Sequence, residues 1–219
     1  MNTKNKDKNK YIIDFASQKL EFGDDYFSIK GGEIVMCRDE DSIMQLHAKI
    51  VCGIDDSVIS AENKDILEFG FGMGMCSDYI QSYNPKSHTI IDCHPDIISR
   101  LEDWATDKPS VKIIKGDWFK NLGEINKGGD GNGKYDGVFF DTHRDENMDL
   151  LVRAYKRYLK PGGIFTFFNA GLGLKSLTNY FDRIDFTDQQ KEEIEYRETE
   201  VPHRGYFRYI KNYVAPILY

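Results

Sequence analysis

The chain has 219 residues, 40% hydrophobic and 13% aromatic, which is enough to bury one sizeable core and predicts a single α/β domain. Its 29 basic and 36 acidic residues give a formal net charge of -7, which argues against a nucleic-acid partner because no basic face is apparent. No apolar run approaches the roughly 20 residues that cross a bilayer, so no membrane helix is expected.

Residues 1–10 are almost all Asn, Lys, Asp and Thr, and they carry too little apolar surface to offset the entropy of ordering. A disordered tail is therefore expected there. Residues 11–55 are predicted to be a helical segment, with a helix over 42–52 and aromatic runs (YIIDFA, DDYFSI) that close over the site as a lid. An ordinary packed N-terminal helix is an equal alternative. Residues 56–219 form the main domain, compact with 11–55.

Short, mostly apolar runs recur along the chain, as is typical of strands covered on both faces. They predict strands at 65–69, 88–92, 111–115, 135–141 and 163–169. Helices are predicted between them at 74–83, 95–105 and 146–159. This alternation indicates a doubly wound, mostly parallel sheet. After Lys191, two extended runs flank a turn near 202–205 and predict an antiparallel hairpin that closes the sheet edge.

The glycine-rich run NKGGDGNGK at 126–134 is interpreted as an exposed loop, with phosphate binding as a minor alternative. A stronger signal is DILEFGFGMG, in which a strand runs into Gly70, Gly72 and Gly74 and then into a helix. Such glycines let the backbone turn sharply and approach a ligand closely. Because Met75 stands where a dinucleotide fingerprint has its third glycine, a dinucleotide is disfavoured.

Acidic residues follow three of the predicted strands. Asp92 ends the strand after the glycine loop, where a carboxylate can accept both ribose hydroxyls. In KGDW, Asp117 can accept an amino group and Trp118 can form an aromatic wall. Asp141 ends the fourth strand, at the sheet edge where open α/β folds bind ligands. An adenosine-type ligand fits this pattern, and a tight turn with solvated strand ends is the alternative. Upstream, VMCRDEDSIM places Glu40 just before a helix.

The segments EFGFGMG, IIDCHPD, KGDW, FFDTH and LKPGGIFTFFNAGLG resemble S-adenosylmethionine-dependent methyltransferases. Over about residues 31–219 the chain is most similar to guanidinoacetate N-methyltransferase and the related arginine δ-N-methyltransferases. The resemblance implies a Rossmann-like fold, S-adenosyl-L-methionine as cofactor and a guanidino substrate. Asp141 matches the aspartate of the family's YDT motif, and Glu40 the glutamate of its VMxxWE-type segment. Asp39 replaces the usual tryptophan and His143 an aromatic residue, which leaves the exact substrate open.

The resemblance also implies the remaining site residues. The expected cofactor contacts are Met36, Glu68, Gly70, Gly72, Met73, Gly74, Asp92, Cys93, His94, Gly116, Asp117, Trp118 and Asp141. The expected substrate contacts are Glu40, Asp141, His143 and the loop of Asn169, Ala170 and Gly171, whose counterpart in the family receives the substrate carboxylate through backbone amides. His143 is a substrate contact, a proton relay or a surface residue.

Guanidino chemistry independently requires acids. A guanidinium has a pKa above ~12, so at neutral pH it has no free lone pair for attack on a methyl group. Two carboxylates can bind the planar fork, direct one nitrogen toward the methyl group and take up its proton. Glu40 and Asp141 are expected to be this catalytic pair. The alternatives are a solvated acid at a helix start for Glu40 and a strand-end cap for Asp141.

The favoured function is methylation of a small molecule such as L-arginine or guanidinoacetate, because no docking module is evident. A protein arginine N-methyltransferase would need a recognition domain or a broad acidic groove, and a cofactor-binding pseudoenzyme would not need both acids. The turn at 144–146 is a candidate partner for the α-amino group of a longer substrate.

No His or Cys grouping has metal spacing, so no metal is expected. Four cysteines without a CxxC pair indicate a reduced, cytoplasmic compartment. A homo-oligomer stays open.

Overall fold

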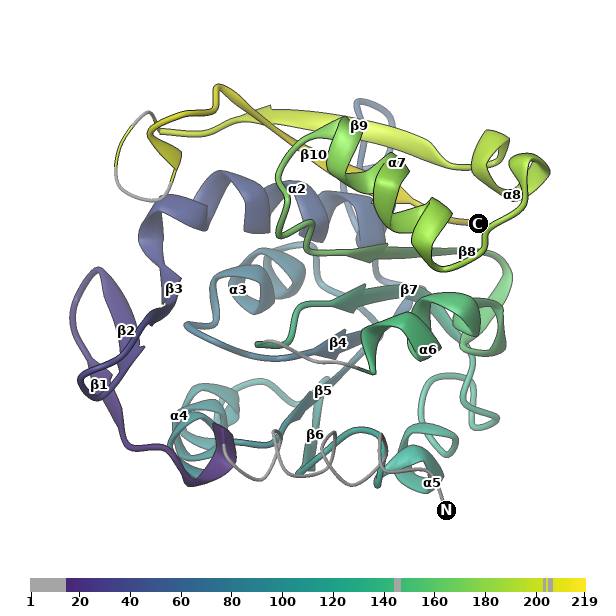
Figure 1. The fold of residues 1–219 in the computed structure, drawn as a ribbon. Coiled ribbons are helices and arrows are strands. Elements are labelled where there is room, and N and C mark those ends of the chain that lie inside the picture. The colour runs from purple at the N-terminus through teal and green to yellow at the C-terminus, as the bar shows by residue number, and fades with distance from the viewer. Residues whose placement is uncertain (1–14, 144–146, 203, 205–206) are drawn as a thin grey trace, which may run out of the picture.

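A computed structural model describes residues 15–143, 147–202, 204 and 207–219. The predicted tail at 1–10 and the turn at 144–146 lie outside the described residues. Five parallel strands form the central sheet in the order β6-β5-β4-β7-β8 (Figure 1). They are β4 (Asp65–Phe69), β5 (Ser87–Asp92), β6 (Val111–Lys115), β7 (Tyr135–Phe140) and β8 (Leu159–Phe167). All five predicted strands are therefore confirmed.

The last strand differs most from its prediction. β8 begins at Leu159, which pairs with Tyr135, and a register shift then carries the pairing on to Ile164 opposite Gly137. Pro161 and the glycines after it lie in this irregular stretch, which is why the apolar run alone suggested a later start. Because β4 lies between β5 and β7, the strand order reverses at β4, and the carboxyl ends of these strands form the crevice where open α/β sheets bind ligands.

Helices cover both faces of the sheet. They are α2 (Asp41–Cys52), α3 (Met75–Ser82), α4 (Pro95–Ala105), α5 (Leu122–Ile125), α6 (Met148–Arg153), α7 (Leu174–Arg183) and α8 (Asp188–Glu192), with 3-10 turns η1 (Arg38–Glu40) and η2 (Tyr155–Arg157). The helices predicted at 42–52, 74–83 and 95–105 are confirmed. The one predicted over 146–159 is too long, since α6 ends at Arg153 and a 3-10 turn leads into β8.

Alternate residues of each strand point into different cores. In β4, Ile66 packs into the core that contains residues of α2, α3 and α4, whereas Leu67 packs into the core that contains residues of α6 and α7. In β7, Phe139 joins the first core and Phe140 the second. Period-two alternation between two apolar faces explains why these strands are mostly apolar, as is typical of a sheet covered by helices on both faces.

The segment before α2 differs from the prediction that residues 11–55 are helical. Its described part contains an antiparallel sheet of β1 (Leu20–Phe22), β2 (Tyr26–Ile29) and β3 (Ile34–Cys37). Tyr26 is 45% exposed whereas Phe27 is 1% exposed, so adjacent aromatic side chains face opposite sides, as in a strand. The aromatic and β-branched residues here favour strands, and the division of the chain into segments stays a prediction.

The C-terminal hairpin is confirmed. β9 (Glu195–Glu200) and β10 (Asn212–Ile217) pair antiparallel (Figure 1). Phe165 of β8 and Leu218 exchange backbone hydrogen bonds of 2.8 and 2.9 Å, which attaches the hairpin to the edge of the central sheet. In the described residues no helix combines the length and apolar character that a membrane crossing needs.

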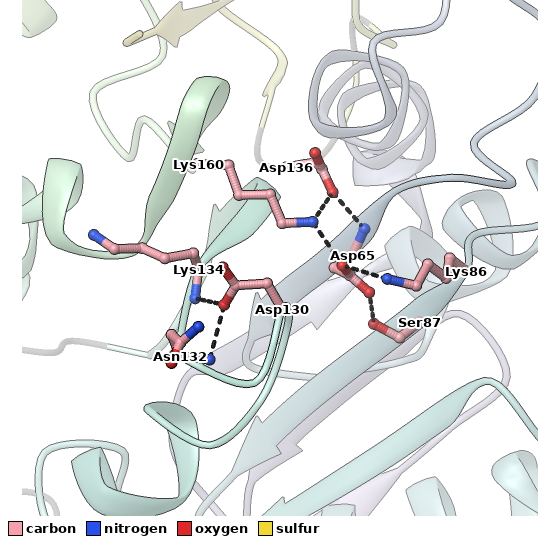
Figure 2. A network of polar contacts seen from close by, with 8 residues as sticks. All are labelled: Asp65, Lys86, Ser87, Asp130, Asn132, Lys134, Asp136 and Lys160. Carbon is pink, nitrogen blue, oxygen red and sulfur yellow. Dashed lines mark hydrogen bonds and ion pairs between the residues drawn. The ribbon is translucent and has the colours of Figure 1, made fainter.

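A polar network ties together the amino ends of the strands, opposite the crevice (Figure 2). Lys160 Nζ lies 2.6 Å from Asp65 Oδ2 and 2.7 Å from Asp136 Oδ2, and Ser87 Oγ donates to Asp65 Oδ1 at 2.6 Å. Burial alone would raise the pKa of Asp65, but the bonds from Lys160, Ser87 and Lys86 outweigh it and leave the pKa lowered. The ion pairs therefore compensate the burial of this carboxylate.

The nearby glycine-rich run at 126–134 is a loop, as predicted. Its acid, Asp130, accepts hydrogen bonds from the backbone amides of Asn132 (2.8 Å) and Lys134 (3.2 Å), as Figure 2 shows. These two amides are therefore occupied within the loop, which argues against the phosphate alternative.

Lys160→Met is expected to lower the free energy of unfolding by about 3 kcal/mol, because it leaves a buried carboxylate without its main cation. Urea denaturation at neutral pH measures the change. Lys134→Met is the matched control, since Lys134 Nζ bonds only backbone carbonyls in the described structure, including that of Arg157 at 2.6 Å. The difference should shrink as the pH falls below 3.8, the ordinary pKa of an aspartate, because protonation removes the charge. Equal effects of both substitutions would contradict this account.

Candidate active site

The loop after β4 brings the backbone close to two other segments. Gly70 has φ +88°, and a Cβ there would lie 1.9 Å from the carbonyl oxygen of Asp141. At Gly72 a Cβ would lie 2.4 Å from Sδ of Met36, and the amide of Met73 donates to the same sulfur at 3.2 Å. The glycines therefore allow the end of β4 to pack directly on the end of β7 and on β3.

A cavity at the carboxyl ends of β4, β5 and β6, called here the strand-end cavity, brings together most of the expected cofactor residues. They are Gly70, Gly72, Asp92, Cys93, Gly116, Asp117, Trp118 and Asp141. Met36 instead lines a neighbouring cavity, and Glu68 lies beneath it in a small void that Asp141 also lines. Met73, Gly74 and His94 are not among the residues that line these cavities.

His94 has a role in the fold. Its Nδ1 accepts the backbone amide of Asp96 at 3.1 Å and caps α4, while its Nε2 lies 2.9 Å from the carbonyl oxygen of Gln18. The carbonyl can only accept, so Nε2 carries the proton of this hydrogen bond. The side chain is 1% exposed, and its two nitrogens are used to join α4 to the N-terminal segment.

Two acids of the strand-end cavity are held by backbone amides. Asp92 accepts the amides of Phe71 and His94 at 3.0 Å each, and burial raises its pKa. Asp117 accepts the amide of Phe119 at 2.9 Å through Oδ1. Its buried Oδ2 has no hydrogen-bond partner among the described residues, the Lys120 ammonium being 3.7 Å away. A buried acceptor left in this way in a cavity wall indicates a polar ligand.

An adjoining cavity, called here the acidic cavity, is lined by four carboxylates: Glu33, Asp39, Glu40 and Asp141. Glu40 Oε1 accepts the backbone amide of Cys37 at 3.2 Å and its thiol at 3.6 Å. Burial raises the pKa of Glu40 to about 7. Burial, followed by the charges of Glu40 and Glu68, raises the pKa of Asp141 well above its usual value. Glu40 and Asp141 both line the acidic cavity, and Asp141 also lines the strand-end cavity.

Two carboxylates of the acidic cavity have basic side chains as partners. His143 Nε2 lies 3.1 Å from Glu33 Oε1, and His143 lines both cavities. Asp39 accepts Nε and Nη2 of Arg204 at 2.8 and 2.7 Å. Two of the four carboxylates in the wall are therefore paired with basic side chains.

The loop after β8 is only partly placed as expected. Ala170 lines the acidic cavity together with Phe168, but Asn169 and Gly171 do not. The amide of Gly171 donates to the side chain of Asn169 at 3.2 Å, and the same side chain donates to the carbonyl of Val214 at 3.2 Å. Asn169 and Gly171 therefore stabilise the loop through hydrogen bonds and do not line the cavity.

Several lining residues were not predicted. Phe15, Val35, Ile97 and Thr142 contribute to the strand-end cavity, and Tyr26 and Phe168 to the acidic cavity. Phe15 packs on His143 at a ring distance of 5.0 Å. Val35, Thr142 and Phe168 lie within the quoted motifs but had not been assigned to a site, and three residues (Phe15, Tyr26 and Val35) come from the segment predicted to be helical. Among the described residues no cluster of His, Cys, Asp and Glu is arranged to hold a metal ion.

The lining residues of the strand-end cavity suit an adenosyl-sulfonium ligand. Gly70 and Gly72 leave no Cβ at the floor, and Asp92 presents a carboxylate at a strand end. Oδ2 of Asp117, which has no hydrogen-bond partner among the described residues, is an acceptor for an amino group. Trp118 packs edge-on against Phe69 at 5.6 Å and supplies an aromatic wall.

Residues 5–210 match the family model described as guanidinoacetate N-methyltransferase. The chain is 34% identical over 168 residues to protein arginine N-methyltransferase 2 of Yarrowia lipolytica, covering 74% of this chain and 34% of that relative. It is 31% identical over 163 residues to the protein of the same name from Saccharomyces cerevisiae, covering 73% of this chain and 38% of that relative. The chain thus spans little more than a third of the length of these curated relatives.

Solved structures confirm the Rossmann-like α/β fold. Spermidine synthase from Thermotoga maritima matches with a TM-score of 0.60 and 10% identity, over 91% of this chain and 71% of that chain. Aeropyrum pernix fibrillarin with natively bound S-adenosyl-L-methionine matches with a TM-score of 0.55 and 12% identity, over 93% and 83%. At these identities the likeness concerns the fold alone.

Proposed function

This chain belongs to the guanidinoacetate N-methyltransferase family, whose cofactor is S-adenosyl-L-methionine, and we propose that it methylates a guanidino nitrogen of a small molecule such as L-arginine or guanidinoacetate. The observation that carries the proposal is the pairing of Glu40 and Asp141 in one cavity wall, with Asp141 shared by the strand-end cavity. A planar cation between these acids would lie next to the place where the cofactor fits.

In this proposal the strand-end cavity holds the cofactor, which supplies an electrophilic methyl group. Gly70 and Gly72 allow close approach of the backbone, Asp92 accepts the ribose hydroxyls, and Asp117 with Trp118 holds the adenine ring. Five other residues were expected at this site but do not line it, and they act by shaping the loop and its neighbours: Met36, Glu68, Met73, Gly74 and His94.

The acidic cavity binds the substrate. Glu40 and Asp141 accept hydrogen bonds from the guanidinium fork and direct one nitrogen toward the methyl group. That nitrogen would form a bond to the methyl carbon as the bond between this carbon and the cofactor's sulfur breaks, with the bonding electron pair staying on sulfur. One proton of the nitrogen would pass to a carboxylate, so the methylated product would remain a single cation. Burial has raised the pKa of both acids, which makes each a better proton acceptor at neutral pH. His143 and the Ala170 loop contact the rest of the substrate.

Protein arginine methylation is the second candidate. The curated relatives carry that name, and the structure shows an acid-lined cavity that the sequence had not revealed. Tyr26 (45% exposed) and Ile34 (57% exposed) line the same cavity and could receive a peptide.

Three further expectations stay predictions: that the segment 11–55 closes over the site as a lid, that the protein is cytoplasmic, and that residues 144–146 contact the substrate. Residues 144–146 lie outside the described residues.

Incubation with labelled S-adenosylmethionine separates these candidates. Free arginine, guanidinoacetate and other small guanidino compounds should accept label, and mass spectrometry of the product should show one added methyl group on a guanidino nitrogen. Labelling confined to arginine-containing peptides or proteins would favour the second candidate. Equal inactivity toward all guanidino groups would contradict the proposed function.

The catalytic rate is expected to depend on the ionisation of Glu40. Its pKa is raised to about 7, so the carboxylate form needed to bind and deprotonate the guanidinium is lost as the pH falls through that value. The ratio kcat/KM should therefore fall on the acid side of about pH 7, while the Kd of the cofactor stays level. Because the charges of Asp141 and Glu40 interact, the fall of kcat/KM on the acid side reports the titration of the two acids together. A profile that is flat from about pH 5 to 9 would contradict this role.

A further inference from the structure

A chain of buried polar groups runs behind one wall of the acidic cavity. The backbone amide of Asn169 donates to Tyr213 Oη at 2.7 Å, and Tyr213 Oη lies 2.8 Å from His47 Nε2. His47 Nδ1 lies 3.0 Å from Thr166 Oγ1, which donates to the carbonyl of Pro216 at 2.6 Å. The chain thus joins α2, β8 and β10 to the loop after β8, elements that Figure 1 shows close together.

The direction of every bond follows from the last one. The hydroxyl of Thr166 has one proton, which it donates to the carbonyl of Pro216. Its oxygen can therefore only accept a hydrogen bond from His47 Nδ1. His47 is fully buried, and burial lowers its pKa to about 3, so the ring is neutral and Nε2 is an acceptor. The hydroxyl of Tyr213 therefore donates to Nε2, and its oxygen accepts the amide behind the cavity wall.

Tyr213 holds that wall in two ways. Its oxygen accepts the amide of Asn169, and its ring stacks on Phe168 with centroids 5.7 Å apart and planes at 25°. Phe168 and Ala170, on either side of Asn169, are the two residues of this loop that line the acidic cavity. Burial, together with the charges of Asp141 and Glu40, raises the pKa of Tyr213, so the hydroxyl keeps its proton for the bond to His47.

We propose that Tyr213 is a positioning residue for the guanidino substrate: its ring and hydroxyl fix the Phe168–Ala170 wall opposite the acids, and His47, oriented by Thr166, fixes the hydroxyl. The proposal rests on the proposed function. A wall held by a fully satisfied buried network needs little reordering when substrate binds. Removing the hydroxyl leaves both the amide of Asn169 and Nε2 of His47 buried without a partner.

The test compares Tyr213→Phe with Tyr135→Phe. Tyr135 is also fully buried, but its hydroxyl donates to the carbonyl of Ile125 at 3.0 Å, away from the cavities. In Tyr213→Phe the KM for the guanidino substrate should rise about three- to tenfold, which is the size of effect expected when one buried hydrogen bond is lost. The value of kcat and the Kd of the cofactor should change little. Deuterium exchange at the amides of 168–170 should become faster. Tyr135→Phe should lower Tm without either effect.

Unchanged KM and unchanged exchange in Tyr213→Phe would overturn the proposal, as would an equal fall in cofactor affinity, which would indicate a general loss of structure. If Tyr213→Phe does not fold, Thr166→Val removes the acceptor that orients His47 and should produce the same rise in KM and in exchange. A wild-type protein that methylates no guanidino compound contradicts the proposed function instead. Exchange at 168–170 then still decides whether Tyr213 holds the wall.

Discussion

Asp141→Ala is expected to reduce kcat/KM for the guanidino substrate by about 10³-fold or more, because it removes both a proton acceptor and one half of the clamp on the guanidinium. The Kd of S-adenosylmethionine should stay within a few fold, since the contact of Asp141 with Gly70 is made by its backbone carbonyl. Single-turnover kinetics and calorimetry of cofactor binding measure the two quantities.

Glu33→Gln is the matched control for this substitution. Glu33 lines the same cavity, but it pairs with His143 at 3.1 Å and is partly exposed, so its loss should change kcat/KM by less than about tenfold. Loss of cofactor binding in Asp141→Ala would mean that this acid acts mainly by binding the cofactor and would contradict its role as a proton acceptor. Similar losses from both substitutions would mean that the cavity acts only through its overall negative charge.

Gly70→Ala is expected to abolish measurable cofactor binding. The new Cβ would lie 1.9 Å from the carbonyl oxygen of Asp141, so the ends of β4 and β7 must separate, and these ends form the floor of the strand-end cavity. Gly131→Ala controls for backbone strain, because Gly131 has φ +87° against +88° for Gly70 and has nothing within 4 Å of a Cβ. The control should cost about 1 kcal/mol of stability and leave the cofactor Kd unchanged.

Thermal unfolding and calorimetry on both variants separate the two effects. If Gly70→Ala does not fold, Gly72→Ala is the milder variant, since its Cβ meets the flexible end of Met36. It should weaken cofactor binding while the fold survives. Wild-type cofactor affinity in Gly70→Ala would show that the close approach of these strand ends is not needed for binding.

The sequence predicted the central sheet well because most of its strands are short, mainly apolar runs bounded by turn residues. The predicted strands at 65–69 and 111–115 agree with the structure to the residue, although β4 is buried throughout and the edge strand β6 exposes Lys112 and Lys115. The prediction of a helical segment was wrong at residues 20–37 because the strands there are only three or four residues long. Runs that short do not distinguish period two from period 3.6.

The sequence predicted those residues of the candidate site that lie in motifs at the ends of strands. Asp92, Asp117 and Asp141 follow strands whose carboxyl ends meet in a parallel sheet, so their proximity follows from the fold. Glu40 lies on a different element, and only the family resemblance connected it to Asp141. Tyr213 had no signal, because its role depends on α2, β8 and β10 packing together.

The central claim is that a guanidinium is held between Glu40 and Asp141 beside the transferable methyl group. A crystal structure with S-adenosylhomocysteine and the guanidino compound that the enzyme methylates tests it most directly. We expect guanidino nitrogens within about 2.7–3.2 Å of both carboxylates, with one nitrogen facing the sulfur of the bound product. Carboxylates of residues 40 and 141 that face away from that sulfur, or a guanidino group bound elsewhere, would contradict the account.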